Sequence, residues 1–159
     1  MIVDLTREDD GWDDIALETL ATRAMGATLA ELEVDPETCE VAILACGDAR
    51  IAELNTEFRS KAAPTNVLSW PAQDLSPPRL PDPDPDGTIP LGDIALSYDT
   101  CAREAAEQGK TLQAHVTHLI VHGTLHLLGY DHERDEDATV MEALEVEILC
   151  KLGLDDPYS

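Results

Sequence analysis

The sequence predicts an α+β fold: a single small domain, with one mixed β-sheet covered by helices and a central histidine-bearing helix. The chain has 159 residues, which suits one domain with a core of ordinary size. Short apolar runs of strand length alternate with longer segments whose apolar residues recur at helical spacing. One such segment, 112–128, is apolar on most sides, as expected for a buried helix. The expected order is helix, strand, helix, two strands and three helices, with the strand order left open.

The first two elements are expected to be a helix and a strand. A helix is predicted over 12–32, where apolar residues repeat at helical spacing and Asp9 or Asp10 can cap the start. The run 40–46 is short and apolar and ends at a Gly-Asp pair, which indicates a buried strand.

A second helix and a second strand follow. Asp48 is expected to cap a helix over 48–58. Its inner face is predicted to carry Ile51, Leu54 and Phe58. Residues 67–70 are predicted to form a strand, which ends because Pro71 follows it.

The segment 72–90 is rich in proline, aspartate and glycine and has too little apolar content for a core. It is therefore expected to be an exposed, mobile loop between two strands, the second over 91–97. A helix over 98–108 follows, with Gly109 as its stop. The last helix is expected over 134–151, with an acidic first turn and an inner face formed by Val140, Met141, Leu144 and Ile148.

Composition restricts the surroundings in which the chain can act. The net charge is −23 with only ten basic residues, so the chain repels polyanions at long range. No apolar run reaches the length of a membrane span and the first residues lack an export pattern, so a cytoplasmic protein without a membrane partner is expected. The cysteines lack C-x-x-C pairs and are predicted to be reduced packing residues: Cys39, Cys46, Cys101 and Cys150.

Three histidines have the spacing of a metal site. His122 and His126 are four residues apart, so they project from one face of the predicted helix. Gly129 is placed where a left-handed residue can end the helix and reverse the chain, which brings His132 back to the open side of the ion. Three neutral imidazoles without a fourth protein ligand suit a catalytic zinc that keeps an open position.

The same spacing occurs in a long zinc-protease motif, but one residue differs. Where the proteases carry the glutamate that acts as general base, this chain has Gly123, which cannot move a proton. Peptide hydrolysis by that route is therefore not expected. A register that uses His118, His122 and His126 is an alternative, disfavoured because its outer imidazoles would lie about 12 Å apart along the axis. Taken singly, His115 and His118 are predicted to be core residues.

Three blocks resemble one bacterial family. They are HGTLHLLGYDH at 122–132, LGDIALS at 91–97 and NTEFRSKAAPTNVLSWP at 55–71. Together they cover about half of the chain in the same order as in the YbeY family, the metal-dependent endoribonucleases of ribosomal RNA maturation.

The resemblance implies a function and a set of site residues. It implies one zinc ion held by His122, His126 and His132, and a functional arginine at Arg59, whose planar guanidinium can clamp phosphate oxygens. It also implies cleavage of single-stranded RNA, maturation of the 3′ end of small-subunit ribosomal RNA, and ribosome quality control. The implied partners are ribosomal RNA and ribosomal proteins or another ribosome-associated factor.

Two departures from the family pattern concern substrate handling. The loop after the arginine often carries an acid where this chain has Ala62 or Ala63, and the loop 72–90 is longer than a minimal member needs. Asp131 and Asp93 are both candidates for orienting a ligand imidazole. The proton acceptor and the nucleophile stay unassigned.

Two other classes of function stay open. One is a metallohydrolase of another bond, such as a peptide or small amide, which Gly123 disfavours. The other is a metal-stabilised ribosome-assembly or interaction factor without nuclease activity, because the acidic surface would attract basic ribosomal proteins.

Overall fold

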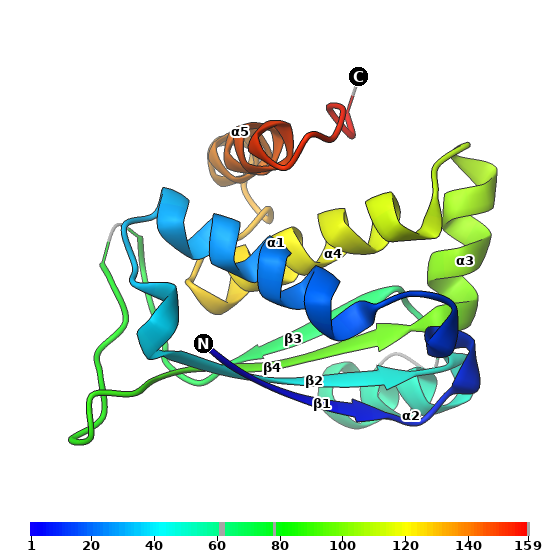
Figure 1. Cartoon of the computed structure of the whole chain (residues 1–159), viewed down its shortest axis with the longest axis horizontal. Helices are drawn as coiled ribbons and strands as arrows, with labels where there is room; N and C mark the ends of the chain where they lie inside the picture. Colours follow the sequence, from blue (N-terminus) through cyan, green and yellow to red (C-terminus); the bar gives the residue numbers. More distant parts are fainter. Residues whose placement is uncertain (61–62, 78, 159) are drawn as a thin grey trace.

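A four-stranded mixed sheet with the strand order β1-β2-β4-β3 forms the middle of the molecule (Figure 1). The computed structural model describes residues 1–60, 63–77 and 79–158. β1 and β2 are parallel, β2 and β4 are parallel, and β3 runs antiparallel to β4. The strands are β1 (Ile2–Arg7), β2 (Cys39–Cys46), β3 (Val67–Pro71) and β4 (Ile89–Ser97). The predicted α+β fold with one mixed sheet is confirmed.

Helices cover both faces of this sheet (Figure 1). They are α1 (Leu17–Glu31), α2 (Asp48–Arg59), α3 (Tyr98–Glu107), α4 (Leu112–Leu127) and α5 (Asp135–Lys151), with short 3-10 helices η1 (Asp10–Asp14) and η2 (Pro36–Thr38). α1 and α4 lie over one face, α2 lies against the other, and α5 packs on α1 and α4 away from the sheet. α4 contacts α1, α3, α5, β3 and β4, so the histidine-bearing helix is central as predicted.

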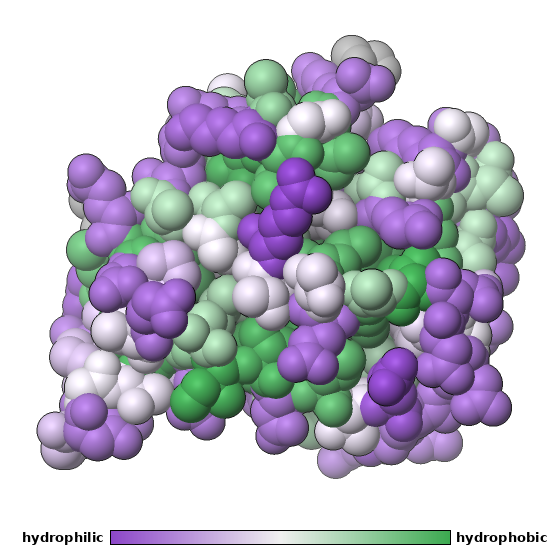
Figure 2. All heavy atoms as spheres, viewed as in Figure 1, coloured by the Kyte–Doolittle hydropathy of each residue, from purple (hydrophilic) through white to green (hydrophobic). Residues whose placement is uncertain are grey.

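The core is divided by the sheet because side chains alternate between its faces. The larger part lies under α1 and α4, where Val41 and Ile43 of β2 meet Ile120 of α4. The smaller part lies under α2 and consists of Cys46, Ile51, Leu54, Leu68 and Ala95. On the face drawn in Figure 2, hydrophilic residues cover much of the outline, and apolar patches lie between them with some hydrophilic side chains across the middle.

The N-terminal strand is the main element that the sequence prediction missed. β1 pairs in parallel with β2 at the edge of the sheet, from Ile2 beside Glu40 to Arg7 beside Ala45. Val3 and Leu5 pack against the larger core, whereas the residues between them are exposed. This alternation is the period of a half-buried strand, so the signal was present but short.

α1 begins at Leu17 and not at Trp12 as predicted. Residues before it form η1, in which the Asp9 carboxylate accepts a hydrogen bond from the Gly11 backbone N–H. Trp12 is fully buried and its Nε1–H donates to the Cys46 carbonyl at 2.9 Å. Ile15 is extended, with φ −132° and ψ 156°, which separates η1 from the helix. Burial of Trp12 against β2 therefore replaces the expected first turn.

Three side chains differ from their predicted positions. Gly47, and not Asp48, is the N-cap of α2, and Asp48 is the first helical residue. Phe58 is 57% exposed and packs edge-on against Trp70 with ring centroids 5.4 Å apart. Val140 of α5 is 53% exposed. Phe58 lies in the last turn of α2 and Val140 lies beside the buried face of α5, so helical spacing alone did not predict their exposure.

The connection between β3 and β4 is partly anchored. Most of its described side chains are exposed, but Leu75 is 7% exposed. The Gln73 amide donates to the Asp82 carbonyl at 2.9 Å and accepts from the Asp82 N–H at 2.8 Å. The beginning of this segment thus packs on the domain, and the mobility of 72–90 stays a prediction.

All four cysteines are free, as expected, but the predicted packing role holds for only three of them. Cys39, Cys46 and Cys101 are buried and Cys150 is exposed. Burial raises the pKa of the Cys46 thiol to about 11 and also raises that of Cys101, so both stay protonated at neutral pH. Among the described helices, none is both long enough and apolar enough to cross a membrane.

Candidate metal centre

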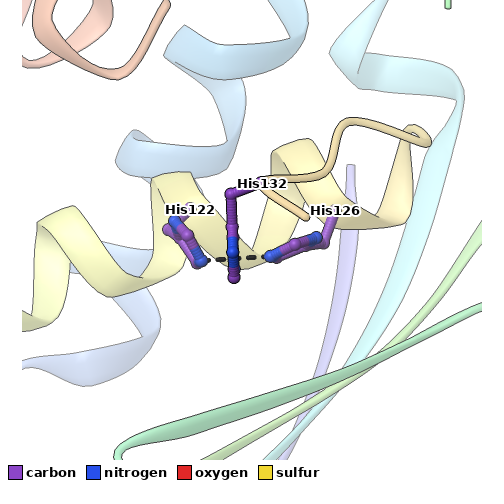
Figure 3. Close-up of side chains that lie close together, drawn as sticks. All are labelled: His122, His126 and His132. Carbon is purple, nitrogen blue, oxygen red and sulfur yellow. Dashed lines mark hydrogen bonds between the residues drawn. The ribbon is translucent and has the colours of Figure 1, made fainter. Parts of the chain in front are cut away.

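Two imidazoles meet on one face of α4 (Figure 3). His122 and His126 are one helical turn apart, and their Nε2 atoms lie 3.0 Å from each other. Between them Gly123 faces the sheet, where an added Cβ would lie 3.3 Å from Ile94 Cδ1. The helix therefore approaches β4 closely at the residue where the zinc proteases carry glutamate.

The chain reverses at Gly129 and returns the third imidazole to the first two. Gly129 has φ +97°, a conformation that favours glycine. The N–H of Gly129 donates to the His126 carbonyl and the N–H of Tyr130 to the Leu125 carbonyl, each at 3.0 Å, which is a Schellman motif. His132 follows three residues later and lies between the other two rings in Figure 3. The expected left-handed end of the helix is confirmed.

The three histidines can hold a metal ion. One ring nitrogen from each of them lies within 4.8 Å of the others. Nitrogens held tetrahedrally by zinc–imidazole bonds of ~2.0–2.1 Å lie roughly 3.3 Å apart, close to the separation of the two Nε2 atoms. His122 and His126 are partly buried and His132 is exposed, so solvent reaches the site.

The charge state of the site suits a cation. Burial, together with repulsion from His122 and His132, lowers the pKa of His126 to about 4, so its ring is neutral at neutral pH. A neutral imidazole has a free lone pair for a metal.

Glu145 of α5 contacts His122 from behind. Its Oε1 lies 2.6 Å from His122 Nδ1 and 3.3 Å from His118 Nε2. Burial opposes ionisation, but hydrogen bonds from His118, His122 and Tyr158 lower the pKa of Glu145 to about 2. His118 thus faces this carboxylate and is not part of the histidine group, which disfavours the alternative register.

Arg59 lies in the same pocket as the three histidines. It is the last residue of α2 and is exposed. The pocket, called the Arg59 pocket below, has a volume of about 400 Å³. Its lining consists of Arg59, Thr65, Asn66, Val67, Leu68, Ser69, His122, Gly123, His126, Asp131, His132 and Glu133.

Arg59 has no acidic partner among the described residues, unlike most of the other arginines. Within the described part of the chain, no carboxylate lies at ion-pair distance from Arg59. Arg23 donates to the Leu152 carbonyl at 3.4 Å. The remaining arginines each contact an acid: Arg7, Arg50, Arg79, Arg103 and Arg134. In a chain with a net charge of −23, this leaves one arginine available to an anion in the pocket.

Two part-buried hydrogen bonds from asparagines hold the loop beside the Arg59 pocket. The Asn55 amide donates to the Ala63 carbonyl at 2.8 Å, which ties the end of the loop after Arg59 back to α2. The Asn66 amide donates to Glu104 Oε1 at 2.9 Å. Ala62, one of the two positions at which the family often carries an acid, lies outside the described residues.

Neither aspartate predicted to orient a ligand has that position. The Asp131 carboxylate accepts from the Glu133 N–H at 2.6 Å and shapes the turn that carries His132. Asp93 is exposed on the opposite face of the sheet, beside Trp70. The carboxylate that contacts a proposed ligand, His122, belongs to Glu145, which the sequence analysis did not select. The pattern that could have indicated it is an acid at a core position of the helix, four residues from both Met141 and Leu149.

Comparisons with known proteins agree with this arrangement. A profile of the family described as Endoribonuclease YbeY matches residues 3–153. Relatives from Ruegeria pomeroyi and Dinoroseobacter shibae, both named Endoribonuclease YbeY, are each 59% identical to this chain. The alignments cover 100% and 98% of this chain, and 99% and 90% of the relatives.

A solved structure shares the fold. A solution structure of a Thermotoga maritima protein has a TM-score of 0.58 and 22% identity, over 96% of this chain and 92% of that one. This likeness concerns the fold alone, whereas the sequence matches extend over nearly the whole chain and span the positions of the three histidines and Arg59. On these matches, the chain belongs to the endoribonuclease YbeY family of hydrolases.

Proposed function

We propose that this chain is a zinc-dependent endoribonuclease that cuts single-stranded RNA, with His122, His126 and His132 as ligands of one zinc ion. Arg59 is the proposed catalytic residue. The observation that carries the proposal is that the histidine group and an arginine without an acid partner line one pocket. Family membership supports RNA as the substrate.

The donor set favours zinc. Three imidazoles, with no further described carboxylate or thiolate in the group, match sites that bind zinc and leave one position open. Zinc bound there supplies polarisation of a phosphoryl oxygen and activation of water.

Arg59 holds the scissile phosphate and stabilises charge in the transition state. Cleavage of a phosphodiester adds negative charge to the phosphoryl oxygens, and a guanidinium presents a planar fork of donors to two of them. Because no acid neutralises it, its charge is directed to the substrate. The anchored wall at Asn66 and Val67 keeps the pocket shaped around that phosphate.

The proposed biological role is maturation of the 3′ end of small-subunit ribosomal RNA and ribosome quality control, in the cytoplasm. Family membership and the resemblance of the three sequence blocks support it. The net charge of −23 supports partners that are basic, such as ribosomal proteins or another ribosome-associated factor, which would deliver an RNA that the acidic surface repels.

Metal analysis combined with cleavage of a ribosomal RNA fragment tests the proposal. Wild type should carry one zinc per chain and cut the fragment. His122→Ala should lose the zinc. Arg59→Ala should keep the zinc but lose about 10²–10³-fold in kcat, as when a preorganised donor to the transition state is removed.

Arg7→Ala is the matched control, because Arg7 is an exposed, ion-paired arginine on β1, at the far edge of the sheet from β3. It should cleave as wild type does. Normal cleavage by Arg59→Ala would remove Arg59 from the mechanism. A wild-type protein that binds zinc and ribosomal proteins but cuts no RNA would instead be an assembly factor.

A further inference from the structure

The buried carboxylate of Glu145 is the most unusual group outside the proposed ligands. Glu145 is 0% exposed and occupies a core position of α5. Burying an ionised carboxylate costs several kcal/mol unless hydrogen bonds compensate, on the order given for ions in protein interiors. Its partners therefore decide whether the residue is tolerated.

Those partners are three side chains, two from α4 and one from the segment after α5. His122 Nδ1 lies 2.6 Å from Oε1, within hydrogen-bond distance. The hydroxyl of Tyr158, in the segment after α5, donates to Oε2 at 2.5 Å. His118 Nε2 lies 3.3 Å from Oε1, and the His118 ring packs edge-on against the Tyr158 ring.

We propose that Glu145 is a positioning residue of the metal centre: it fixes His122 in the tautomer with the proton on Nδ1 and the Nε2 lone pair directed at the ion. His118 and Tyr158 hold the carboxylate in place. The inference rests on the proposed zinc site, and it assigns functions to residues on α5 and in the following segment.

The physical reason is the single proton of a neutral imidazole. An ionised carboxylate accepts hydrogen bonds only, so the ring nitrogen that faces it must carry the proton. The other nitrogen is then free to bind metal, and the ring cannot turn without losing the hydrogen bond. Nε2 of His122 does point at His126, 3.0 Å from its Nε2, in accordance with this tautomer (Figure 3).

Zinc affinity measured by competition with a chelating dye tests the proposal without an activity assay. Glu145→Gln keeps the shape but no longer requires a proton on Nδ1. It should weaken zinc binding about 10- to 100-fold, as for other groups that hold a ligand histidine. Glu142→Gln is the matched control, because Glu142 is an exposed acid of the same helix and the change in charge is identical. It should leave the affinity within about twofold of wild type.

A spectroscopic measurement separates positioning from a merely structural role. Long-range nitrogen–proton NMR of histidine-labelled, metal-free protein reports which nitrogen of His122 carries the proton, because zinc bound to Nε2 would leave the proton on Nδ1 in every variant. Wild type and Glu142→Gln should show the proton on Nδ1, whereas Glu145→Gln should lose this hydrogen-bonded proton signal. An unchanged His122 signal in a folded Glu145→Gln protein would overturn the inference.

Tyr158→Phe provides a milder variant in case Glu145→Gln does not fold. Tyr158 is 49% exposed, so removal of its hydroxyl leaves the core intact. The expected loss of zinc affinity is smaller, up to about tenfold. Unchanged affinity in both Tyr158→Phe and Glu145→Gln would overturn this inference alone, whereas a wild type that binds no zinc would overturn the proposed function.

Discussion

Gly129 and Gly153 end their helices in the same way but in different surroundings. Each has a positive φ, +97° and +81°, and each belongs to a Schellman motif. A Cβ on Gly129 would lie 2.3 Å from the Leu75 carbonyl oxygen, whereas nothing lies within 4 Å of one on Gly153. Glycine is therefore favoured at position 129 for two reasons: its left-handed backbone conformation and the closeness of the 72–77 segment.

This pair of glycines gives a prediction at the residue scale. Gly153→Ala should lower the free energy of unfolding by about 1–2 kcal/mol, because of the left-handed conformation alone. Gly129→Ala should cost a further ~1–3 kcal/mol, because the Leu75 backbone must move. Urea unfolding of both variants measures the difference. Equal losses would mean that the contact with Leu75 is relieved at no cost.

At the scale of elements, Asp48 joins α2, β4 and α3. Its Oδ1 accepts hydrogen bonds from the hydroxyls of Ser97 and Thr100, each at 2.6 Å. Its backbone N–H donates to the Asp99 carboxylate at 2.9 Å. The acid predicted to cap one helix thus ties together three elements, because tertiary structure brings the end of β4 beside the start of α2.

Asp48→Ala is expected to lower the free energy of unfolding by about 1–3 kcal/mol at pH 7, since two hydroxyls lose a charged partner. Burial opposes ionisation, but the bonds from Ser97 and Thr100 and the charge of Arg103 lower the pKa of Asp48 from 3.8. A carboxyl whose pKa is lower in the folded state than in the unfolded state stabilises the fold at pH values above its unfolded-state pKa. This stabilisation is lost as the pH falls through the folded-state pKa.

The difference between wild type and Asp48→Ala should therefore shrink below about pH 4, as the unfolded-state carboxyl becomes protonated. Denaturant unfolding between pH 7 and pH 3 measures this trend. Glu57→Ala, an exposed acid on the same helix, is the control and should show little change. A difference that grows toward low pH would contradict the assignment.

The elements were predictable where the local pattern was long. The range predicted for α4 differs from the observed Leu112–Leu127 by one residue, because sixteen residues carry several helical repeats. β1 has only six residues at the sheet edge, and η1 depends on the burial of Trp12 against β2. Contacts between segments that are distant in the sequence cannot be predicted from the pattern of a few neighbouring residues.

At the scale of the whole molecule, the proposed zinc site would couple metal binding to folding. Zinc that binds only the folded chain should stabilise it by ~2.7 kcal/mol at a hundred times the dissociation constant. For a chain of this size, that corresponds to a rise in Tm of roughly 5–10 °C. Thermal unfolding with zinc and with a chelator measures the shift, which His126→Ala should abolish. An equal shift in His126→Ala would place the zinc elsewhere.

The acidic surface leads to a prediction about salt. If RNA contacts only one or two cations, such as Arg59, the logarithm of affinity for single-stranded RNA should fall with that of salt concentration by a slope of about −0.7 to −1.4. Repulsion by the net charge of −23 should flatten this slope further. Binding measured between low and physiological salt gives the value. A much steeper slope would require a basic surface that the chain lacks.

The sequence by itself determined the histidine group, because its spacing depends only on helix periodicity and on a glycine that ends the helix. It also determined the α+β class, since apolar runs of two lengths alternate along the chain. Only the tertiary structure decided that Arg59 shares a pocket with the histidines and that Glu145 stands behind His122. These residues come from α2, which packs on β4 and α3, and from α5, which packs on α4, so only the tertiary arrangement brings them to the histidines.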